Sequence, residues 1–247
     1  MKKIFKPVVQ FYLKIFTKII LRRHRPFVIS VAGTTNKTTV KEYILKFLRE
    51  KYGESEVRGN PKSYNTEIGL PLAILYLESG DSSSLKWLKI LIQAKIMALF
   101  GRKFPSKLVL ELGVEEKGDM KELLEIVKPN VAIITNIEGS YTYSNSSLEV
   151  IKDELKQLIL KIPADGYVLL NSDDERVKEL KDFARGKVIT YGFQEGSDAW
   201  ATEQKTDVEG QTFSFDFQGK SEPVRIRKYG RQNIYAWMAA KVVKSIL

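Results

Sequence analysis

The sequence contains no cysteine and a single histidine, His24. The lack of cysteine excludes disulfide bonds and thiolate metal sites. One histidine, set in a basic segment, cannot supply a histidine zinc site, and a Ser-His-Asp triad has almost nothing to draw on. Any catalysis must therefore depend on lysines, carboxylates, bound Mg²⁺ and backbone amides.

Acidic residues are missing from the first tenth of the chain. Residues 1–25 carry eight lysines and arginines and no aspartate or glutamate. Subtracting these eight charges from the net charge of +10 leaves +2 for the remaining residues, which are therefore nearly neutral. The basic character belongs to one segment, and we expect no nucleic-acid partner.

The same segment lacks an uninterrupted hydrophobic run. A polar residue recurs every three or four positions, and most of the others are apolar; the polar positions are Lys3, Lys6, Gln10, Lys14, Lys18 and Arg22. This pattern predicts one helix over residues 1–22 and excludes a signal peptide or a membrane span. Two interpretations remain open. The helix lies on an anionic membrane surface, or it packs its apolar face on this domain or another protein.

The remaining sequence alternates strands and helices. We expect strands at 27–32, 108–112, 131–135, 167–170 and 188–191, and helices at 37–51, from 69, and at 85–100, 118–127, 147–161 and 174–184. This order predicts an α/β fold with a P-loop-type, mostly parallel sheet covered by helices on both faces. After residue 197 the period becomes two, which predicts a small antiparallel β appendage before a last helix at 231–247. We expect two parts, the helix of residues 1–25 and a domain of residues 26–247.

Residues 28–43 have the layout of a phosphate-binding loop. A β-branched run leads into a small-residue turn, then Lys37 and Thr38, then a helix. In such a loop backbone amides cradle phosphate oxygens, the lysine neutralises the β/γ-phosphates and the hydroxyl reaches Mg²⁺. Asn36 stands where glycine is usual, and we expect it to adopt a positive φ. The alternative is a threonine-rich turn with no ligand.

Glu111 lies inside an otherwise apolar strand. A buried carboxylate is costly unless it is paired or binds a metal. If its strand lies beside the strand of the phosphate loop, Glu111 can hold Mg²⁺. The alternative is an edge position that faces water.

Three polar groups follow strands or precede helices, where either a ligand contact or a helix cap is expected. Asn136 ends the strand at 131–135, at the edge where α/β sheets bind ligands. Residues 65–67 precede the helix that starts at 69, and a cap is the simpler role. Residues 171–174 follow another strand, with the same two alternatives.

Taken in order, these segments resemble the ATP-binding central domain of the Mur ligase family, closest to the MurF type. GTTNKTT at 33–39 resembles the family's GTxGKTT loop. SYNTEIGLPLAIL at 63–75, the run at 108–137, VLLNSDDE at 168–175 and GRQNIYAWMAA at 230–240 are similar to its other motifs, and SLEVIKDEL at 147–155 resembles the helix of its carbamylated lysine.

The resemblance implies an ATP-dependent acid–amine ligase acting on a UDP-sugar-peptide-like acyl substrate in the cytoplasm, as in peptidoglycan-precursor synthesis. ATP phosphorylates a carboxylate, and an amine displaces the phosphate. Lys37 would stabilise the transferring phosphoryl group, Thr38 and Glu111 would hold one Mg²⁺, and Lys152, as a carbamate, would help hold a second. Asn233 would approach the adenine. The remaining cofactor contacts would come from Gly33, Thr34, Thr35, Asn36, Thr39 and Asn136.

The sequence also departs from the family pattern. Asn36 replaces a glycine, and Tyr141 and Gln232 stand where the family has histidines. The family's N-terminal UDP-sugar domain and C-terminal domain have no counterpart in the 247 residues. These departures support the alternative hypothesis of a non-ligating nucleotide-binding module associated with a membrane surface, as a peripheral protein on its inner face, or with a partner protein.

Overall fold

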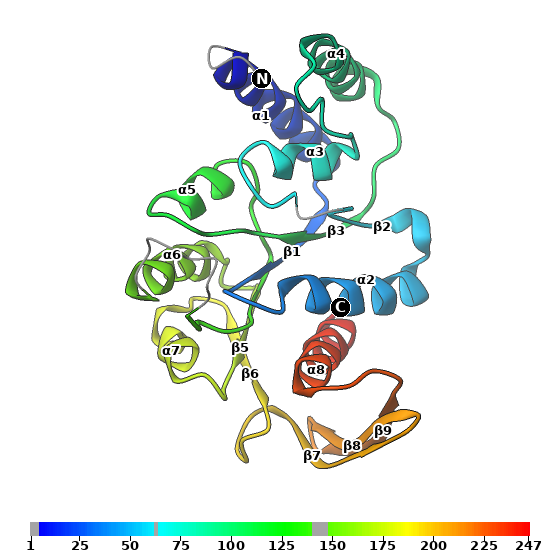
Figure 1. The fold of residues 1–247 in the computed structure, drawn as a ribbon, viewed down its shortest axis with the longest axis vertical. Coiled ribbons are helices and arrows are strands. Elements are labelled where there is room, and N and C mark those ends of the chain that lie inside the picture. Colours follow the sequence, from blue (N-terminus) through cyan, green and yellow to red (C-terminus); the bar gives the residue numbers. More distant parts are fainter. Residues whose placement is uncertain (1–4, 62–63, 140–147) are drawn as a thin grey trace.

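The computed structural model describes residues 5–61, 64–139 and 148–247. Its strands form one sheet in the order β2-β3-β1-β4-β5-β6-β7-β8-β9 (Figure 1). Their bounds are β1 Phe27–Ala32, β2 Val57–Gly59, β3 Lys107–Glu111, β4 Val131–Ile134, β5 Tyr167–Asn171, β6 Lys187–Gly192, β7 Ala199–Asp207, β8 Gly210–Phe217 and β9 Lys220–Ile226. The α-helices are α1 Phe5–His24, α2 Lys37–Tyr52, α3 Gly69–Leu75, α4 Ser84–Phe100, α5 Asp119–Leu124, α6 Leu148–Lys161, α7 Glu175–Lys178 and α8 Arg231–Ile246.

Strand β1 lies at the centre of the parallel part of the sheet, between β3 and β4. The chain leaves β1 toward β2 and β3 on one side, and then crosses to β4 on the other side. In open α/β sheets, ligands bind at the carboxyl ends of the strands where the strand order reverses in this way. The loop that follows β1 therefore occupies the position at which this fold places a ligand.

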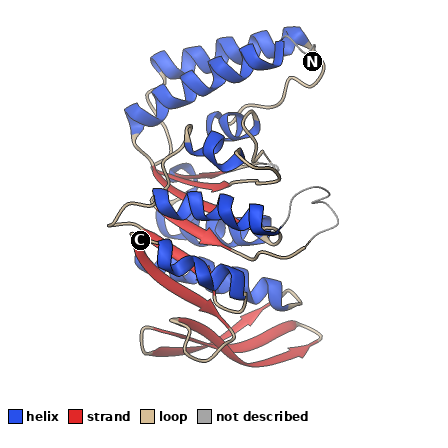
Figure 2. Ribbon diagram, turned by 90° about the vertical axis from the view of Figure 1, so that its left-hand side faces the viewer, coloured by secondary structure: helices blue, strands red, loops and turns tan. Residues whose placement is uncertain are grey.

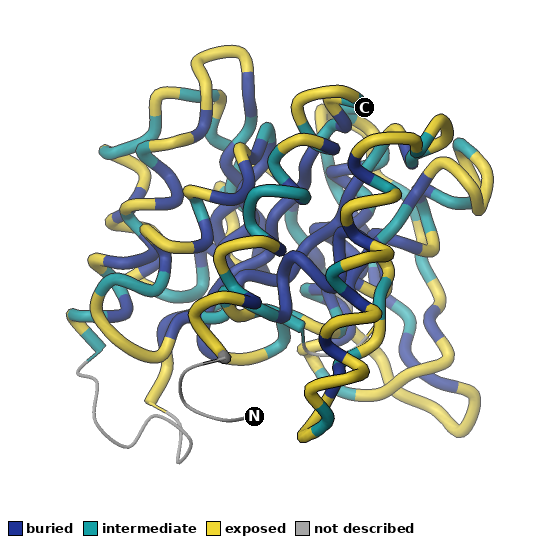
Figure 3. The backbone as a smooth tube through the Cα atoms, turned by 90° about the horizontal axis from the view of Figure 1, so that it is seen from above, coloured by how far each residue is buried: buried dark blue, intermediate teal, exposed yellow. Residues whose placement is uncertain are grey.

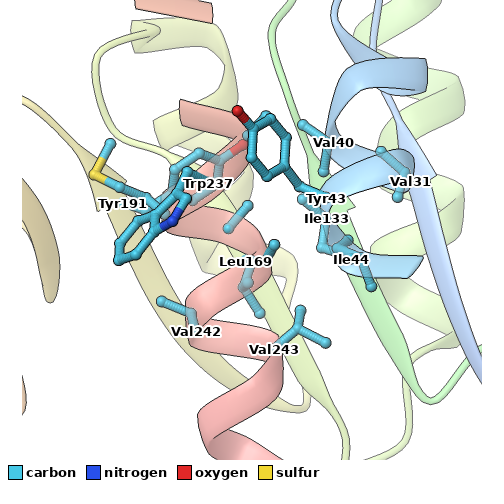
Figure 4. Close-up of a cluster of buried hydrophobic side chains, with 14 of the residues drawn as sticks. Val31, Val40, Tyr43, Ile44, Ile133, Leu169, Tyr191, Trp237, Val242 and Val243 are labelled. Atoms are coloured by element: carbon cyan, nitrogen blue, oxygen red, sulfur yellow. The ribbon is translucent and has the colours of Figure 1, made fainter. Parts of the chain in front are cut away.

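Helices cover both faces of the sheet. Consecutive side chains of a strand point to opposite faces, so each strand contributes to a core on either side. Ile29 and Val31 of β1 belong to the hydrophobic core on one face, where α2 and α8 pack (Figure 4). Val28 and Ala32 belong to the core on the other face, which α3, α5, α6 and α7 cover. The strands read as near-continuous apolar runs because both of their faces are buried.

The C-terminal part of the sheet is antiparallel. Strand β7 pairs in parallel with the end of β6, and β7–β8 and β8–β9 pair in antiparallel. The predicted appendage is thus a continuation of the same sheet, and the predicted fold class is confirmed.

A separate pair of helices crosses one end of the molecule (Figure 2). Helices α1 and α4 pack side by side and share a hydrophobic cluster with α3, in which Val9, Leu13, Leu72 and Trp87 are buried. None of the described helices combines the length and the apolar character that a membrane span requires.

Some predicted elements differ from those in the structure. Strand β2 was not expected because three residues are too short to show a period, and β7 was also missed. The helix predicted at 118–127 is shorter, because Gly118 has a φ of 103° and the turn after Leu124 tightens. The helix predicted at 174–184 begins after Asp174, its N-cap, and becomes a 3₁₀ helix at Glu179–Phe183.

Candidate nucleotide-binding site

The loop that joins β1 to α2 begins with a glycine that no other residue could replace. Gly33 has a φ of 137°, and a Cβ atom there would lie 2.1 Å from Thr135 Oγ1. The Thr135 hydroxyl itself donates a hydrogen bond to the carbonyl of Thr35, at 2.7 Å. The end of β4 therefore presses directly against the loop and fixes its path.

Asn36 adopts the left-handed conformation, with φ 63° and ψ 2°, which confirms the sequence prediction. It stands at the N-cap position of α2, and its side chain makes no cap hydrogen bond there. Instead, its Nδ2 donates to the carbonyl of Gln232 at 2.9 Å. Two of the positions that depart from the Mur ligase pattern thus connect the loop to the start of α8.

Asn136 braces the loop from the end of β4. Its Oδ1 accepts a hydrogen bond from the Thr35 amide at 2.9 Å, and its Nδ2 donates to Thr35 Oγ1 at 2.6 Å. Its carbonyl accepts from the Thr34 amide at 2.9 Å. These contacts give Asn136 a loop-positioning role, while its predicted contact with a nucleotide stays a prediction.

Lys37, the first residue of α2, is half-buried and turns back onto its own loop. Its Nζ donates to the carbonyls of Gly33 at 2.7 Å and Thr34 at 2.9 Å. Burial lowers the pKa of Lys37 below its ordinary value, and the negative charges of Glu111 and Glu115 oppose this shift. A cation held in a desolvated loop is suited to binding an anion, because less hydration must be lost.

Glu111 ends β3, which pairs with β1 so that Glu111 lies opposite Val31. Glu111 is 1% exposed, and its Oε2 lies 3.3 Å from Thr38 Oγ1. Because β3 lies between β2 and β1, the prediction that it neighbours the loop strand is confirmed and the alternative of a water-facing edge is wrong. The strands thus bring Thr38 and Glu111 together.

Lys41, the buried cation that pairs with Glu111, was not predicted from the sequence. Lys41 lies one helical turn after Lys37 and is 2% exposed. Its Nζ is 2.9 Å from Glu111 Oε1, 2.9 Å from the Asn60 carbonyl and 3.1 Å from Glu42 Oε1. Asn60 in turn accepts a hydrogen bond from the Glu111 amide at 2.8 Å. Its position on the apolar side of α2, near Val40 and Ile44, was the one available signal.

A divalent cation fits this arrangement. Glu111 Oε1 is paired with Lys41 at 2.9 Å, and the other carboxylate oxygen, Oε2, is the one that lies 3.3 Å from Thr38 Oγ1. Thr38 is exposed beside the carboxylate. Oxygen ligands of this type suit Mg²⁺, which usually combines one or two protein groups with phosphates and water. No group of three or more metal-ligating side chains occurs among the described residues, so the remaining ligands would be phosphates and water.

Lys152, predicted to help hold a second Mg²⁺, forms an ion pair with Glu179. The hydrogen bond from Lys152 to Glu179 raises the pKa of this lysine. A protonated amine does not form a carbamate, so the predicted carbamate requires the amine to leave Glu179. Tyr141 lies outside the described residues.

Asn233, predicted to approach the adenine, lies in the first turn of α8. Its Nδ2 donates to the carbonyl of Tyr229 at 2.7 Å, and its side chain is almost fully buried. This bond fixes the turn that precedes α8. Its adenine contact stays a prediction.

The acidic groups after β5 have structural contacts. Asp174 caps α7, one of its two predicted roles, and it also accepts a hydrogen bond from the Ile137 amide at 2.7 Å. Asp173 accepts bonds from the Phe193 amide and from the Tyr235 hydroxyl, at 2.8 and 2.6 Å. Asp174 thus connects the segment after β4 to α7, and Asp173 connects the segment after β6 to α8. Before α3, Thr66 Oγ1 accepts a weak bond from the Gly69 amide at 3.3 Å, while the N-cap residue of the helix is Ile68, which makes no side-chain cap bond.

The loop after β1 and the Thr38–Glu111 pair belong to a chain that matches a known protein family. Residues 90–243 match the family described as the Mur ligase middle domain, which is more than half of the chain. The chain belongs to the Mur ligase middle-domain family.

Its relatives include UDP-N-acetylmuramoyl-tripeptide–D-alanyl-D-alanine ligases and a UDP-N-acetylmuramate–L-alanine ligase of Clostridium perfringens, which is 34% identical over 91 residues. A UDP-N-acetylmuramoyl-tripeptide–D-alanyl-D-alanine ligase of Borreliella burgdorferi is 27% identical over 219 residues, which cover 84% of this chain and 38% of that protein. Two solved structures, MurF from Acinetobacter baumannii and MurF from Thermotoga maritima in complex with ADP, give TM-scores of 0.74 and 0.73 at 19% and 22% identity. Each comparison covers 96% of this chain and 47% or 49% of the other. The Mur ligase fold is therefore shared, and the chain spans less than half the length of these relatives.

Proposed function

We propose that this chain binds Mg-ATP at residues 33–39 and acts as the central ATP-binding domain of a Mur-type acid–amine ligase. The observation that carries the proposal is the placement of Lys37, Thr38 and Glu111 around one loop at the switch point of the sheet. The ADP complex of the MurF from Thermotoga maritima supports a nucleotide as the ligand class.

Each residue has a distinct role in this proposal. Lys37 exchanges the carbonyls of Gly33 and Thr34 for phosphate oxygens and neutralises their charge. Thr38 and Glu111 hold Mg²⁺, and Lys41 keeps the Glu111 carboxylate directed toward Thr38. Mg²⁺ held by these two residues would supply charge neutralisation for phosphoryl transfer. Gly33 and Asn136 keep the loop amides in place.

The names of the relatives suggest the substrates. They are ligases that join a UDP-N-acetylmuramoyl-tripeptide to D-alanyl-D-alanine. By analogy, a carboxylate of a UDP-sugar-peptide-like substrate attacks the γ-phosphate of ATP, releasing ADP and forming an acyl phosphate. An amine then displaces phosphate and loses a proton as the amide forms. Asn233 at the adenine and Lys152 at a second Mg²⁺ are the further residues that the family pattern assigns.

The nucleotide proposal is tested by replacing Lys37 with alanine and titrating the chain with ATP and Mg²⁺ in a calorimeter. The substitution removes a charge-assisted phosphate contact of about 1.5–3 kcal/mol, so the affinity should fall roughly ten- to hundredfold. The matched control is Lys46→Ala, an exposed lysine of the same helix, which should bind ATP as the unmodified chain does. Equal affinity in the Lys37→Ala variant would reject the assignment.

The same titration has an expected pH dependence. Because burial lowers the pKa of Lys37, this side chain loses its charge at a lower pH than an ordinary lysine. The ATP affinity should therefore decline with rising pH before the ordinary lysine range is reached. The Lys37→Ala variant should show no such decline.

We also propose that residues 1–22 contact an anionic membrane surface from the cytoplasmic side. Both interpretations of this segment find support in α1. Val9, Leu13 and Ile20 pack against the domain, while Phe11 and Tyr12 stay exposed on the other side of the helix. The part of the predicted helix at residues 1–4 lies outside the described residues.

A further inference from the structure

The outer surface of α1 and α4 carries most of the exposed apolar side chains of the molecule. Thirteen large apolar side chains are exposed in the part of the chain that the structure describes, and ten of them belong to these two helices. We call these ten the outer face: Val8, Phe11, Tyr12, Ile19, Leu85, Leu88, Ile92, Ile96, Leu99 and Phe100. Single exposed apolar residues are ordinary, but a gathered set of this kind marks an interaction surface.

Helix α4 is apolar on two opposite sides. Its buried stripe consists of Trp87, Ile90, Ala94 and Ala98. Residues advance by about 100° along a helix, so Leu88, Ile92 and Ile96 lie on the side opposite this stripe. An apolar stripe on a helix normally faces a packed core, and α4 has a second such stripe on its exposed side. The exposed side of α4 therefore lacks its expected apolar environment.

The two helices present their outer face as one unit. The buried stripes of α1 and α4 belong to the same cluster, so their exposed sides both point away from the domain. The Arg23 guanidinium donates to the carbonyl of Leu99 at 3.1 Å and holds the C-terminal ends together. Figure 2 shows the helices side by side across one end, and Figure 3 looks down on that end. Both helix axes can thus lie along one flat surface.

The positive charge of the end formed by α1 and α4 favours an anionic binding surface. Neither α1 nor α4 contains an aspartate or glutamate. Lys86, Lys89 and Lys95 of α4 flank its outer stripe and form no ion pair with a carboxylate of the described residues. In α1, Lys6 and Lys14 are paired with Glu67 and Glu125, so α4 supplies unpaired charges. Beside α1, a cavity of about 520 Å³ is lined by four cations and one carboxylate, Lys18, Arg22, Arg25, Lys128 and Glu125. A second copy of the chain would bring the same positive charges face to face.

We propose that α1 and α4 together form a peripheral membrane-binding platform. The outer face enters the boundary between the headgroups and the acyl chains of an anionic bilayer, and the flanking lysines contact the lipid phosphates. Helix α4 contributes more apolar surface than α1 and is the main inserting element. The proposal extends the contact proposed above for residues 1–22 and does not depend on nucleotide binding.

The lack of cysteine permits a direct test with single labels. A polarity-sensitive fluorophore is attached to Ile92→Cys on α4, to Phe11→Cys on α1, and to the control Val208→Cys, which is exposed in the turn between β7 and β8. Each labelled chain is mixed with vesicles of phosphatidylcholine alone or with added phosphatidylglycerol. We expect a blue shift at positions 92 and 11 with the anionic vesicles, reduced by salt, and none at position 208.

Vesicle co-sedimentation measures the contributions of the apolar and charged groups. Leu88→Gln with Ile92→Gln should weaken binding about tenfold or more, because two inserted side chains are lost. Lys89→Gln with Lys95→Gln should weaken it about fivefold per charge. The exposed controls Val208→Gln and Lys220→Gln should leave it unchanged. All of these positions are exposed, and circular dichroism verifies that each variant is folded.

The possible outcomes distinguish binding to a bilayer from self-association of the chain and from nucleotide binding. No shift at position 92 on anionic vesicles would overturn the proposal. A shift without lipid that grows with protein concentration would also overturn it, in favour of a second copy. Lys37→Ala should bind vesicles normally, so a chain that binds vesicles but not ATP contradicts the proposed function alone.

Discussion

The buried pair of Lys41 and Glu111 fixes the position of the carboxylate proposed to bind Mg²⁺. Removing one partner of a buried ion pair leaves an uncompensated charge and typically costs about 3–5 kcal/mol. We therefore expect Lys41→Met to reduce the free energy of unfolding in urea by about this amount. Since Mg-ATP would supply a new positive charge to Glu111, it should raise the melting temperature of this variant more than that of the unmodified chain.

Two further variants identify the cause of this effect. Lys46→Met, an exposed lysine on the same helix, should change the free energy of unfolding little. Lys41→Met combined with Glu111→Gln removes both charges and should recover most of the lost stability. If the double variant is as unstable as Lys41→Met alone, the loss comes from packing around the methionine and the charge argument is wrong.

The sequence predicted some residues of the candidate site and missed others for a physical reason. Glu111 was found because a lone acid in an apolar strand is costly, and Asn36 because asparagine tolerates a positive φ. Lys41 was missed because a lysine on a charged helix is ordinarily exposed. Its burial depends on Asn60 and Glu111, which are brought to it by β2 and β3. Such contacts arise only from the tertiary structure.

At the scale of the element, the turn between β1 and α2 depends on the left-handed conformation of Asn36. A β-branched side chain is strained at a φ of 63°, at a cost of about 1–3 kcal/mol. Asn36→Val should therefore weaken ATP binding about tenfold. Asn36→Gly loses the hydrogen bond to Gln232 but gains conformational freedom, and it should bind ATP within about threefold of the unmodified chain. Calorimetric titration measures both, and equal binding by the valine variant would contradict the strain argument.

Most helices and strands were predictable because their apolar periods are long. The strand before the loop and the helix after it coincide with β1 and α2 within one residue. The elements that were missed or mispredicted are short or depend on turns. Strand β2 is held by pairing with β3 alone, and α7 passes into a 3₁₀ helix. The membership of α1 in a helix pair with α4 was also not predictable, because it depends on packing across the chain.

At the scale of the whole molecule, the two proposed surfaces belong to different parts of the fold. The platform of α1 and α4 crosses one end, and the antiparallel strands β7–β9 lie at the opposite end (Figure 1). The nucleotide loop follows β1, an interior strand between β3 and β4. Binding of the platform to a bilayer would therefore leave the phosphate loop uncovered, and the two activities can be measured independently.

Residues 1–247 alone should bind Mg-ATP without ligase turnover. Acyl-phosphate chemistry requires that the amine is positioned and that water is excluded. This chain spans less than half of the solved relatives that share its fold, and Lys152 is paired with Glu179.

The assay follows release of ADP and phosphate with a UDP-N-acetylmuramoyl-tripeptide and D-alanyl-D-alanine, with and without the C-terminal part of a MurF relative. Slow hydrolysis of ATP that requires Lys37 is compatible with this expectation, because one metal and the γ-phosphate suffice for it. Amine-dependent turnover by residues 1–247 alone would contradict it and would exclude the hypothesis of a non-ligating module.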